Sequence, residues 1–216
     1  MTELVIFDCD GVLVDSESIG TAVLARAAIR EGAAIGIEEA QRLFRGLKMA
    51  DCVAEIERRS GRRLDDSFVA EVRQTMAAAF DSELRAIDGI HAALAAITAP
   101  VCVASNGPMA KMAHTLRLAG LFDHFSGRIF SAYDVGVWKP DPGLFLHAAR
   151  TLGAEPLRCV VVEDSLSGIR AANAAGMRVL GYTAASAENA AVLGSECSEL
   201  FHRMDELPAL LSRQRV

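Results

Sequence analysis

Four carboxylate side chains stand close to the ends of two short apolar segments of this chain. Asp8 and Asp10 follow the first segment, and Glu163 and Asp164 follow the second. Asp8 and Asp10 are two positions apart, so in an extended backbone their side chains would share a face. Carboxylates gathered in one place repel one another unless a divalent cation neutralises them, and a set of oxygen ligands suits Mg²⁺. The pattern therefore indicates an acidic site that can hold Mg²⁺.

Two further polar groups could act beside these carboxylates. Ser105-Asn106-Gly107 follows another apolar segment, and Lys139 lies in a proline-stiffened loop, Val137–Pro142. Lysine is scarce in this chain, since only three of the 22 basic residues are lysines. A compact ammonium group in that loop could balance the acidic residues and hold a phosphoryl oxygen.

Each of these groups, taken alone, also has a structural explanation. An Asp at a strand end is often a turn residue or a helix cap, and Ser105-Asn106-Gly107 could be an ordinary turn. Glu163-Asp164 could cap a helix that begins near Ser167, and Lys139 could be a solvated loop residue. In an open parallel sheet, however, the carboxyl ends of the strands face one crevice. Because polar groups follow three apolar segments in the same way, we expect them to form one site.

Short, almost wholly apolar segments alternate with helical stretches along most of the chain. The expected strands are Leu4–Phe7, Val101–Ala104, Ile129–Ser131, Cys159–Val162 and Arg178–Tyr182. The expected helices are Ile90–Ile97, Met109–Leu118, Gly143–Leu152 and Ser167–Ala175, with Gly120, Gly153 and Gly176 at helix ends. This alternation predicts an α/β fold with a Rossmann-like, doubly wound parallel sheet as its core.

One long segment interrupts the alternation. From about Glu17 to Leu84 the sequence is helix-rich and shows no convincing buried strand. We therefore expect a Rossmann-like catalytic core formed by residues 1–14 and 85–216, with an inserted helical domain at 15–84.

Composition limits the classes of function. The chain has 216 residues, and 51% of them are hydrophobic, which excludes a disordered chain. Its net charge of −6 argues against a general nucleic-acid binder. No apolar run reaches the roughly 18–20 residues of a membrane span, and the N-terminus does not resemble a secretory signal. We expect a soluble, cytoplasmic protein with no nucleic-acid or membrane partner. A monomer is expected, and the sequence leaves an oligomer open.

The cysteines and histidines show no metal-binding or disulfide pattern. The five cysteines are odd in number and scattered, and no two of them form a C-x-x-C pair. The five histidines lack a close chelating spacing. We therefore expect neither a disulfide framework nor a zinc site.

Four motifs together resemble those of the haloacid dehalogenase-like hydrolase superfamily in both order and spacing. They are Asp8-Cys9-Asp10-Gly11-Val12-Leu13, Ser105-Asn106-Gly107, Lys139-Pro140-Asp141-Pro142 and Glu163-Asp164-Ser165. The resemblance covers essentially the whole chain, including an insertion after the first motif like the helical cap domain of that family. The pattern is most similar to the branch of β-phosphoglucomutases and sugar phosphatases. It implies an Mg²⁺-dependent phosphomonoester hydrolase that acts on small sugar or sugar-acid phosphates, such as 6-phosphogluconate.

The resemblance also implies roles for the residues of the site. Asp8 would be the nucleophile that forms an aspartyl-phosphate, and Asp10 would be the general acid and base. Mg²⁺ would be held by Asp8, the backbone carbonyl of Asp10 and Asp164, with Glu163 as a direct or supporting ligand. The phosphoryl oxygens would contact Ser105, Lys139 and the backbone N–H groups of Asn106 and Gly107.

The inserted domain would select the small phosphorylated substrate. Phe44-Arg45-Gly46-Leu47-Lys48 matches the region that reaches the substrate in related phosphatases. Arg45 and Lys48 could bind the far end of the substrate, for example a carboxylate, or could belong to a solvated basic helix face. Glu17 could instead bind hydroxyl groups.

The sequence also leaves three other functions open. A β-phosphoglucomutase-like mutase would carry a histidine where this chain has Gly20, which favours hydrolysis. Dehalogenases and phosphonatases of the superfamily lack an acid such as Asp10, although Lys48 lies near the position of a phosphonatase lysine. A catalytically idle binding protein would not need the intact set of Asp8, Asp10, Lys139 and Asp164.

Overall fold

The structure is a computed structural model that describes residues 2–44, 47–183 and 187–213. The chain divides into two compact units, Met1–Val14 with Ala86–Val216, called here the sheet unit, and Asp15–Arg85, called the helical unit. The domain division predicted from the sequence, 1–14 with 85–216 and 15–84, differs from this clustering only in the assignment of Arg85. Within the described ranges, every helix is too short or too polar to cross a membrane.

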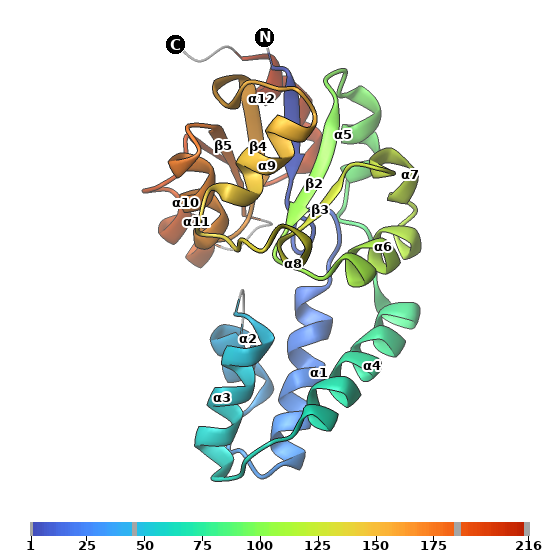
Figure 1. The fold of residues 1–216 in the computed structure, drawn as a ribbon, viewed down its shortest axis with the longest axis vertical. Helices are drawn as coiled ribbons and strands as arrows, with labels where there is room; N and C mark the ends of the chain where they lie inside the picture. Colours follow the sequence, from blue (N-terminus) through green and yellow to red (C-terminus); the bar gives the residue numbers. More distant parts are fainter. Residues whose placement is uncertain (1, 45–46, 184–186, 214–216) are drawn as a thin grey trace. The chain divides into compact units, whose positions relative to one another are not determined.

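The sheet unit contains a fully parallel sheet, confirming the expected α/β class (Figure 1). Its strands are β1 (Leu4–Phe7), β2 (Val101–Ser105), β3 (Ile129–Ser131), β4 (Cys159–Glu163), β5 (Arg178–Tyr182) and β6 (Glu199–Phe201). They lie in the order β3-β2-β1-β4-β5-β6. The chain adds strands on one side of β1 and then on the other, so the carboxyl ends of β2, β1 and β4 are neighbours.

The five strands expected from the sequence are all present. The additional edge strand, Glu199–Phe201, was not expected, because three residues that begin with a charged one carry no recognisable apolar run. Its pairing with β5 places Phe201 beside Tyr182, where the two rings lie 5.2 Å apart.

Helices cover both faces of this sheet. They are α5 (Ile90–Ala96), α6 (Met109–Leu118), α7 (Phe122–Phe125), α8 (Ala132–Val135), α9 (Gly143–Thr151), α10 (Leu166–Ala174), α11 (Ala187–Leu193) and α12 (Leu207–Ser212), with short 3₁₀ turns at Pro156–Arg158 and Met204–Glu206. Neighbouring residues of β1 point to opposite faces. Ile6 joins the core beneath α9 and α10, whereas Phe7 meets Phe125 of α7 edge-on at 6.0 Å. Both faces of the strand are therefore buried, which explains why its sequence is continuously apolar.

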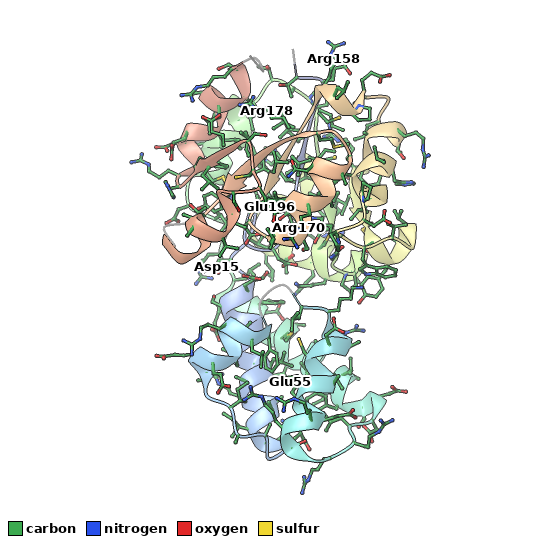
Figure 2. All side chains as sticks on the ribbon, turned by 90° about the vertical axis from the view of Figure 1, so that its left-hand side faces the viewer. Asp15, Glu55, Arg158, Arg170, Arg178 and Glu196 are labelled. Atoms are coloured by element: carbon green, nitrogen blue, oxygen red, sulfur yellow. The ribbon has the colours of Figure 1, made fainter. Side chains whose placement is uncertain are left out.

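Polar contacts secure α10, the helix that follows β4. Figure 2 shows Arg170 of this helix next to Glu196, and the guanidinium group donates to both carboxylate oxygens at 2.8 and 2.7 Å. At the start of the helix, Ser165 is the N-cap and accepts a hydrogen bond from Gly168 N at 3.1 Å. These contacts hold a helix whose first turn lies at the site described below.

The helical unit has a core of its own. Its described residues form α1 (Glu17–Arg30), α2 (Ile37–Phe44), α3 (Met49–Ser60) and α4 (Asp66–Glu83), as the helix-rich sequence indicated. Side chains from all four helices form one buried cluster that includes Leu24, Phe44, Ile56 and Val72. Figure 2 marks Glu55 of α3 in this unit. Glu55 receives hydrogen bonds from Arg58 and Arg59.

Candidate active site

The loop after β1 places Asp8 and Asp10 at the carboxyl end of the sheet. The Asp8 backbone N–H donates to Val162 O at 3.0 Å, which continues the pairing of β1 with β4. The chain then turns back on itself, because Gly11 adopts a φ of +82°, and Gly11 N donates to Val14 O at 2.8 Å. A positive φ of this kind favours glycine over residues with a side chain. The turn keeps both aspartates within one loop at the strand end.

Lys139 connects the two acidic strand ends. Its Nζ donates to Asp8 Oδ1 and to Glu163 Oε1, each at 2.6 Å. The residue is only 4% exposed, and its ammonium group also lies 4.8 Å from the centre of the Phe145 ring. Lys139 is therefore not a solvated loop residue: it is a buried cation between two carboxylates 131 and 24 positions away in the sequence.

Burial and neighbouring charges shift the pKa values of Asp8 and Lys139. Burial raises the pKa of the Asp8 carboxyl above its ordinary value, the charges of Glu163 and Asp10 raise it further, and Lys139 opposes the shift. Burial alone would lower the pKa of Lys139, but the carboxylates of Asp8 and Glu163 outweigh that effect and raise it. Asp8 thus stands where additional positive charge would favour its ionised form.

Glu163 is buried and surrounded by donors. Its Oε1 accepts from Lys139, and its Oε2 accepts from Asp164 N at 3.0 Å and from the backbone N and the hydroxyl of Ser165, both at 2.9 Å. Because both carboxylate oxygens already accept hydrogen bonds, the geometry fits Glu163 to holding Lys139 in place better than to ligating a metal directly.

Asp10 is held by a lysine that the sequence reasoning did not select. Lys111 Nζ donates to both Asp10 carboxylate oxygens at 2.8 Å, across 101 positions of sequence. Burial alone would lower the pKa of Lys111, but the charge of Asp10 outweighs it and the pKa is raised. Two features of the sequence could have identified Lys111. Lysine is scarce in this chain, and Lys111 lies in the first turn of the helix that follows Ser105-Asn106-Gly107.

Hydrogen bonds to Ser131 and to Lys139 hold the loop after β2 in place. Gly107 N donates to Ser105 Oγ at 3.3 Å, and Gly107 O accepts from the buried Ser131 hydroxyl at 2.7 Å. The side chain of Asn106 faces Lys139 instead, accepting from Lys139 N at 2.9 Å and donating to Lys139 O at 3.4 Å. Asn106 therefore joins the β2 loop to the Lys139 loop, and Ser131 is a second supporting residue that sequence reasoning missed.

Asp164 lies against the loop that follows β1. A Cβ atom added to Gly11 would stand only 2.1 Å from Asp164 Oδ2, so the carboxylate occupies the space that a side chain at position 11 would need. The structure thus brings the acidic residues of β1 and of β4 together.

These residues fit a magnesium ion that is held partly by the protein. Asp8, Asp10, Glu163 and Asp164 carry four carboxyl groups against the two ammonium groups of Lys139 and Lys111, an excess of two negative charges. Among the described residues, no group of three or more Asp, Glu, His or Cys side chains is arranged to hold a metal ion by itself. Mg²⁺ is commonly held by one or two carboxylates and completed by water and substrate phosphate, so the chemistry of this donor set is compatible with the ion.

The sequence also predicts that Arg45 and Lys48 bind the far end of the substrate. Arg45 lies outside the described residues. Lys48 is the exposed N-cap residue of α3 in the helical unit. Binding of the far end of the substrate by Arg45 and Lys48 therefore stays a prediction.

The fold and the site define a class of enzyme. A parallel α/β sheet with an inserted helical unit carries two aspartates after β1, a β2 loop, a buried lysine and an acidic pair after β4. A family model of the haloacid dehalogenase-like hydrolases matches residues 2–176. The chain belongs to this family.

Comparison with individual proteins agrees with this assignment. The chain is 37% identical to the 6-phosphogluconate phosphatase of Escherichia coli over 209 residues, which cover 96% of this chain and 94% of the relative. A haloacid dehalogenase-like protein from Agrobacterium tumefaciens has a TM-score of 0.86 at 37% identity and 98% coverage of both chains. A family hydrolase from Deinococcus radiodurans, solved with phosphate and sodium, has a TM-score of 0.78 at 30% identity and covers 98% of this chain and 95% of that one. The chain is therefore a haloacid dehalogenase-like phosphatase.

Proposed function

We propose that the protein hydrolyses phosphomonoesters of small sugars or sugar acids through an aspartyl-phosphate at Asp8, with Mg²⁺ bound. The main support is the buried Lys139, which lies 2.6 Å from Asp8 Oδ1 and is anchored on its other side by Glu163. A cation beside a buried carboxylate can neutralise the charge of an arriving phosphoryl group. Phosphoryl transfer depends chiefly on such positioning and charge neutralisation.

Two aspartates divide the chemical steps. An Asp8 oxygen attacks phosphorus and forms an O–P bond while the ester O–P bond breaks, and the leaving oxygen takes a proton from Asp10. Asp10 then accepts a proton from a water molecule, the resulting hydroxide attacks phosphorus, and the bond to Asp8 breaks. Inorganic phosphate leaves, and both aspartates return to their starting states.

The remaining residues of the sheet unit hold the phosphoryl group. Lys139 and the Ser105 hydroxyl bind its oxygens, and the backbone N–H groups of Asn106 and Gly107 provide further donors. Asp8, Asp164 and the Asp10 carbonyl would hold Mg²⁺, with Glu163 in support; the ion would supply charge neutralisation at the phosphoryl oxygens. Neutral and cationic donors around one phosphoryl group stabilise charge as it develops.

The helical unit, acting as a cap domain, would select the leaving group. The similarity to a 6-phosphogluconate phosphatase, 37% over nearly the full length of both chains, supports a sugar-acid phosphate as substrate. Arg45 and Lys48 are the candidates for binding its carboxylate. We further propose that the enzyme acts as a cytoplasmic monomer.

A substrate screen tests this function. Purified protein is incubated with a panel of sugar and sugar-acid phosphates, with Mg²⁺ and with excess chelator, and phosphate release is measured. We expect release that requires Mg²⁺ and is fastest for a sugar or sugar-acid phosphate. Asp8→Asn should lower turnover by more than about 10³-fold, and rapid acid quenching with ³²P-labelled substrate should trap label on the wild-type enzyme only. Normal turnover by Asp8→Asn would reject the proposal.

A specificity measurement tests the binding residues separately. Arg45→Ala and Lys48→Ala should raise KM for 6-phosphogluconate more than KM for a sugar phosphate without a carboxylate, such as glucose 6-phosphate, if these residues bind the carboxylate. Equal effects on both substrates would argue against carboxylate binding by these residues.

A further inference from the structure

Gly168 lies in the first turn of α10 and is packed directly against Glu163. A Cβ atom added to Gly168 would stand 1.7 Å from Glu163 Oε1, 2.0 Å from Cδ and 2.5 Å from Oε2. Real Cβ atoms essentially never approach other atoms this closely, so a side chain at position 168 would require Glu163 or the helix backbone to shift. The carboxylate of Glu163 therefore occupies the volume that any side chain at position 168 would need.

Backbone conformation does not explain this glycine. Gly168 is not among the glycines with positive φ, and its N–H is satisfied by the N-cap hydroxyl of Ser165. Glycine is also among the least favourable residues for a helix. A comparable glycine within a helix, Gly20 of α1, has Met76 Cε at 3.9 Å as its nearest contact, which is ordinary packing. The close approach at Gly168 is thus specific to its position beside Glu163.

The Glu163 carboxylate makes its hydrogen bonds where it lies against Gly168. Its Oε2 accepts two backbone N–H groups and one hydroxyl at the start of α10, and its Oε1 accepts from Lys139. The start of a helix favours negative charge. Glu163 is wholly buried, so a displaced carboxylate could not find the same set of donors elsewhere without moving Lys139.

We propose that Gly168 is a positioning residue: by lacking a side chain it admits the Glu163 carboxylate over the first turn of α10, and Glu163 in turn places Lys139 beside Asp8. This inference deepens the proposed function and depends on it for its catalytic consequence. Gly168 itself touches neither substrate nor metal and acts only through Glu163.

A double-mutant experiment tests the proposal. Gly168→Ala is made in the wild-type protein and in Glu163→Asp, whose carboxylate is one methylene shorter and leaves room for the new Cβ. Tm and kcat/KM for the best phosphomonoester are measured for all four proteins. Gly36→Ala is the matched control, because a Cβ at that position would meet nothing within 4 Å.

The two backgrounds should respond differently. In the wild type, we expect Gly168→Ala to lower kcat/KM at least tenfold and Tm by about 5 °C. In Glu163→Asp, the same change should lower kcat/KM less than threefold and Tm by no more than about 2 °C. Gly36→Ala should leave both quantities close to those of the wild type.

The outcomes separate this inference from the proposed function. Equal effects of Gly168→Ala in both backgrounds, failure to fold in both, or wild-type Tm and activity in the single variant would overturn it. A variant that folds only in Glu163→Asp would support it. The Tm difference between backgrounds does not depend on catalysis, so an inactive wild type with background-dependent Tm would reject the phosphatase proposal and still support the placement of Glu163 by Gly168.

Discussion

The amide side chain of Asn106 is paired with the backbone of Lys139. Oδ1 accepts from Lys139 N at 2.9 Å and Nδ2 donates to Lys139 O at 3.4 Å, joining two loops 33 positions apart. The loop after β2 therefore carries the residue that orients the Lys139 loop. This relationship links the phosphate-binding donors to the buried cation beside Asp8.

Loss of that amide should weaken catalysis more than folding. We expect Asn106→Ala to lower kcat about 10- to 100-fold, because Lys139 loses its backbone support, and to lower stability by about 1–2 kcal/mol for the lost hydrogen bonds. Steady-state kinetics and urea unfolding measure the two effects. Asn173→Ala is the control, since that side chain also bonds a backbone carbonyl, Glu196 O, but lies on the exposed side of α10. Similar loss of activity in both variants would contradict the prediction.

The ion pair between Lys111 and Asp10 should matter most for poor leaving groups. If Lys111 orients Asp10 for proton transfer, Lys111→Met should lower kcat/KM for a sugar phosphate about 100-fold. The loss should be far smaller for p-nitrophenyl phosphate, whose leaving group needs little protonation. Comparing the two substrates in one enzyme preparation measures the difference. Arg117→Met, on the same helix and stacked on Phe122, is the control. An equal loss on both substrates would show that Lys111 does not act through the acid.

Ser131 should be needed to hold the loop after β2. Its buried hydroxyl donates to Gly107 O at 2.7 Å and accepts from Tyr133 N at 3.2 Å. Ser131→Ala leaves that carbonyl without this donor, so we expect a stability loss of about 1–3 kcal/mol and an increase in KM. Ser131→Thr retains the hydroxyl, so its stability and its KM should stay closer to those of the wild type. Chemical unfolding and substrate titration check this, and unchanged values for Ser131→Ala would refute it.

The helical unit should carry an acid-sensitive ion-pair network. Hydrogen bonds from Arg58 and Arg59 lower the pKa of Glu55 to about 2 from 4.5. Because the pKa is lower in the folded protein, this contribution to stability is complete above about pH 4.5 and is lost as the pH falls toward 2. The urea midpoint of the wild type should therefore exceed that of Glu55→Gln at pH 6, with the gap narrowing by pH 2.5. Glu38→Gln, a change at an exposed acidic residue of α2, is the control, and a gap independent of pH would contradict the assignment.

Local sequence patterns predicted most of the secondary structure in the sheet unit. Strands such as Leu4–Phe7 and Arg178–Tyr182 were recognised with the bounds observed, because buried parallel strands are short continuous apolar runs. The end glycines Gly120, Gly153 and Gly176 have the positive φ that their positions suggested. Glu199–Phe201 was missed because it becomes a strand only through its partner β5.

Side-chain pairings were harder to foresee. The residues expected at the sheet edge do gather there in the case of Asp8, Lys139 and Glu163. The partner of Asp10, Lys111, is separated from it by 101 positions and carries no motif of its own. The dependence of Glu163 on the missing side chain at Gly168 can be seen only once α10 is packed against the end of β4.

The order of apolar runs, turns and acidic residues in the chain already determined a parallel α/β sheet with reactive groups at its strand ends, since these follow from hydrophobic burial and backbone geometry near each residue. Only the tertiary structure decided which charged side chains form ion pairs with one another. The contacts of Lys139 and of Lys111 depend on how strands far apart in sequence are ordered around β1, and on the absence of a Cβ where two elements approach. Those distances are set by packing across the sheet, which no local pattern encodes.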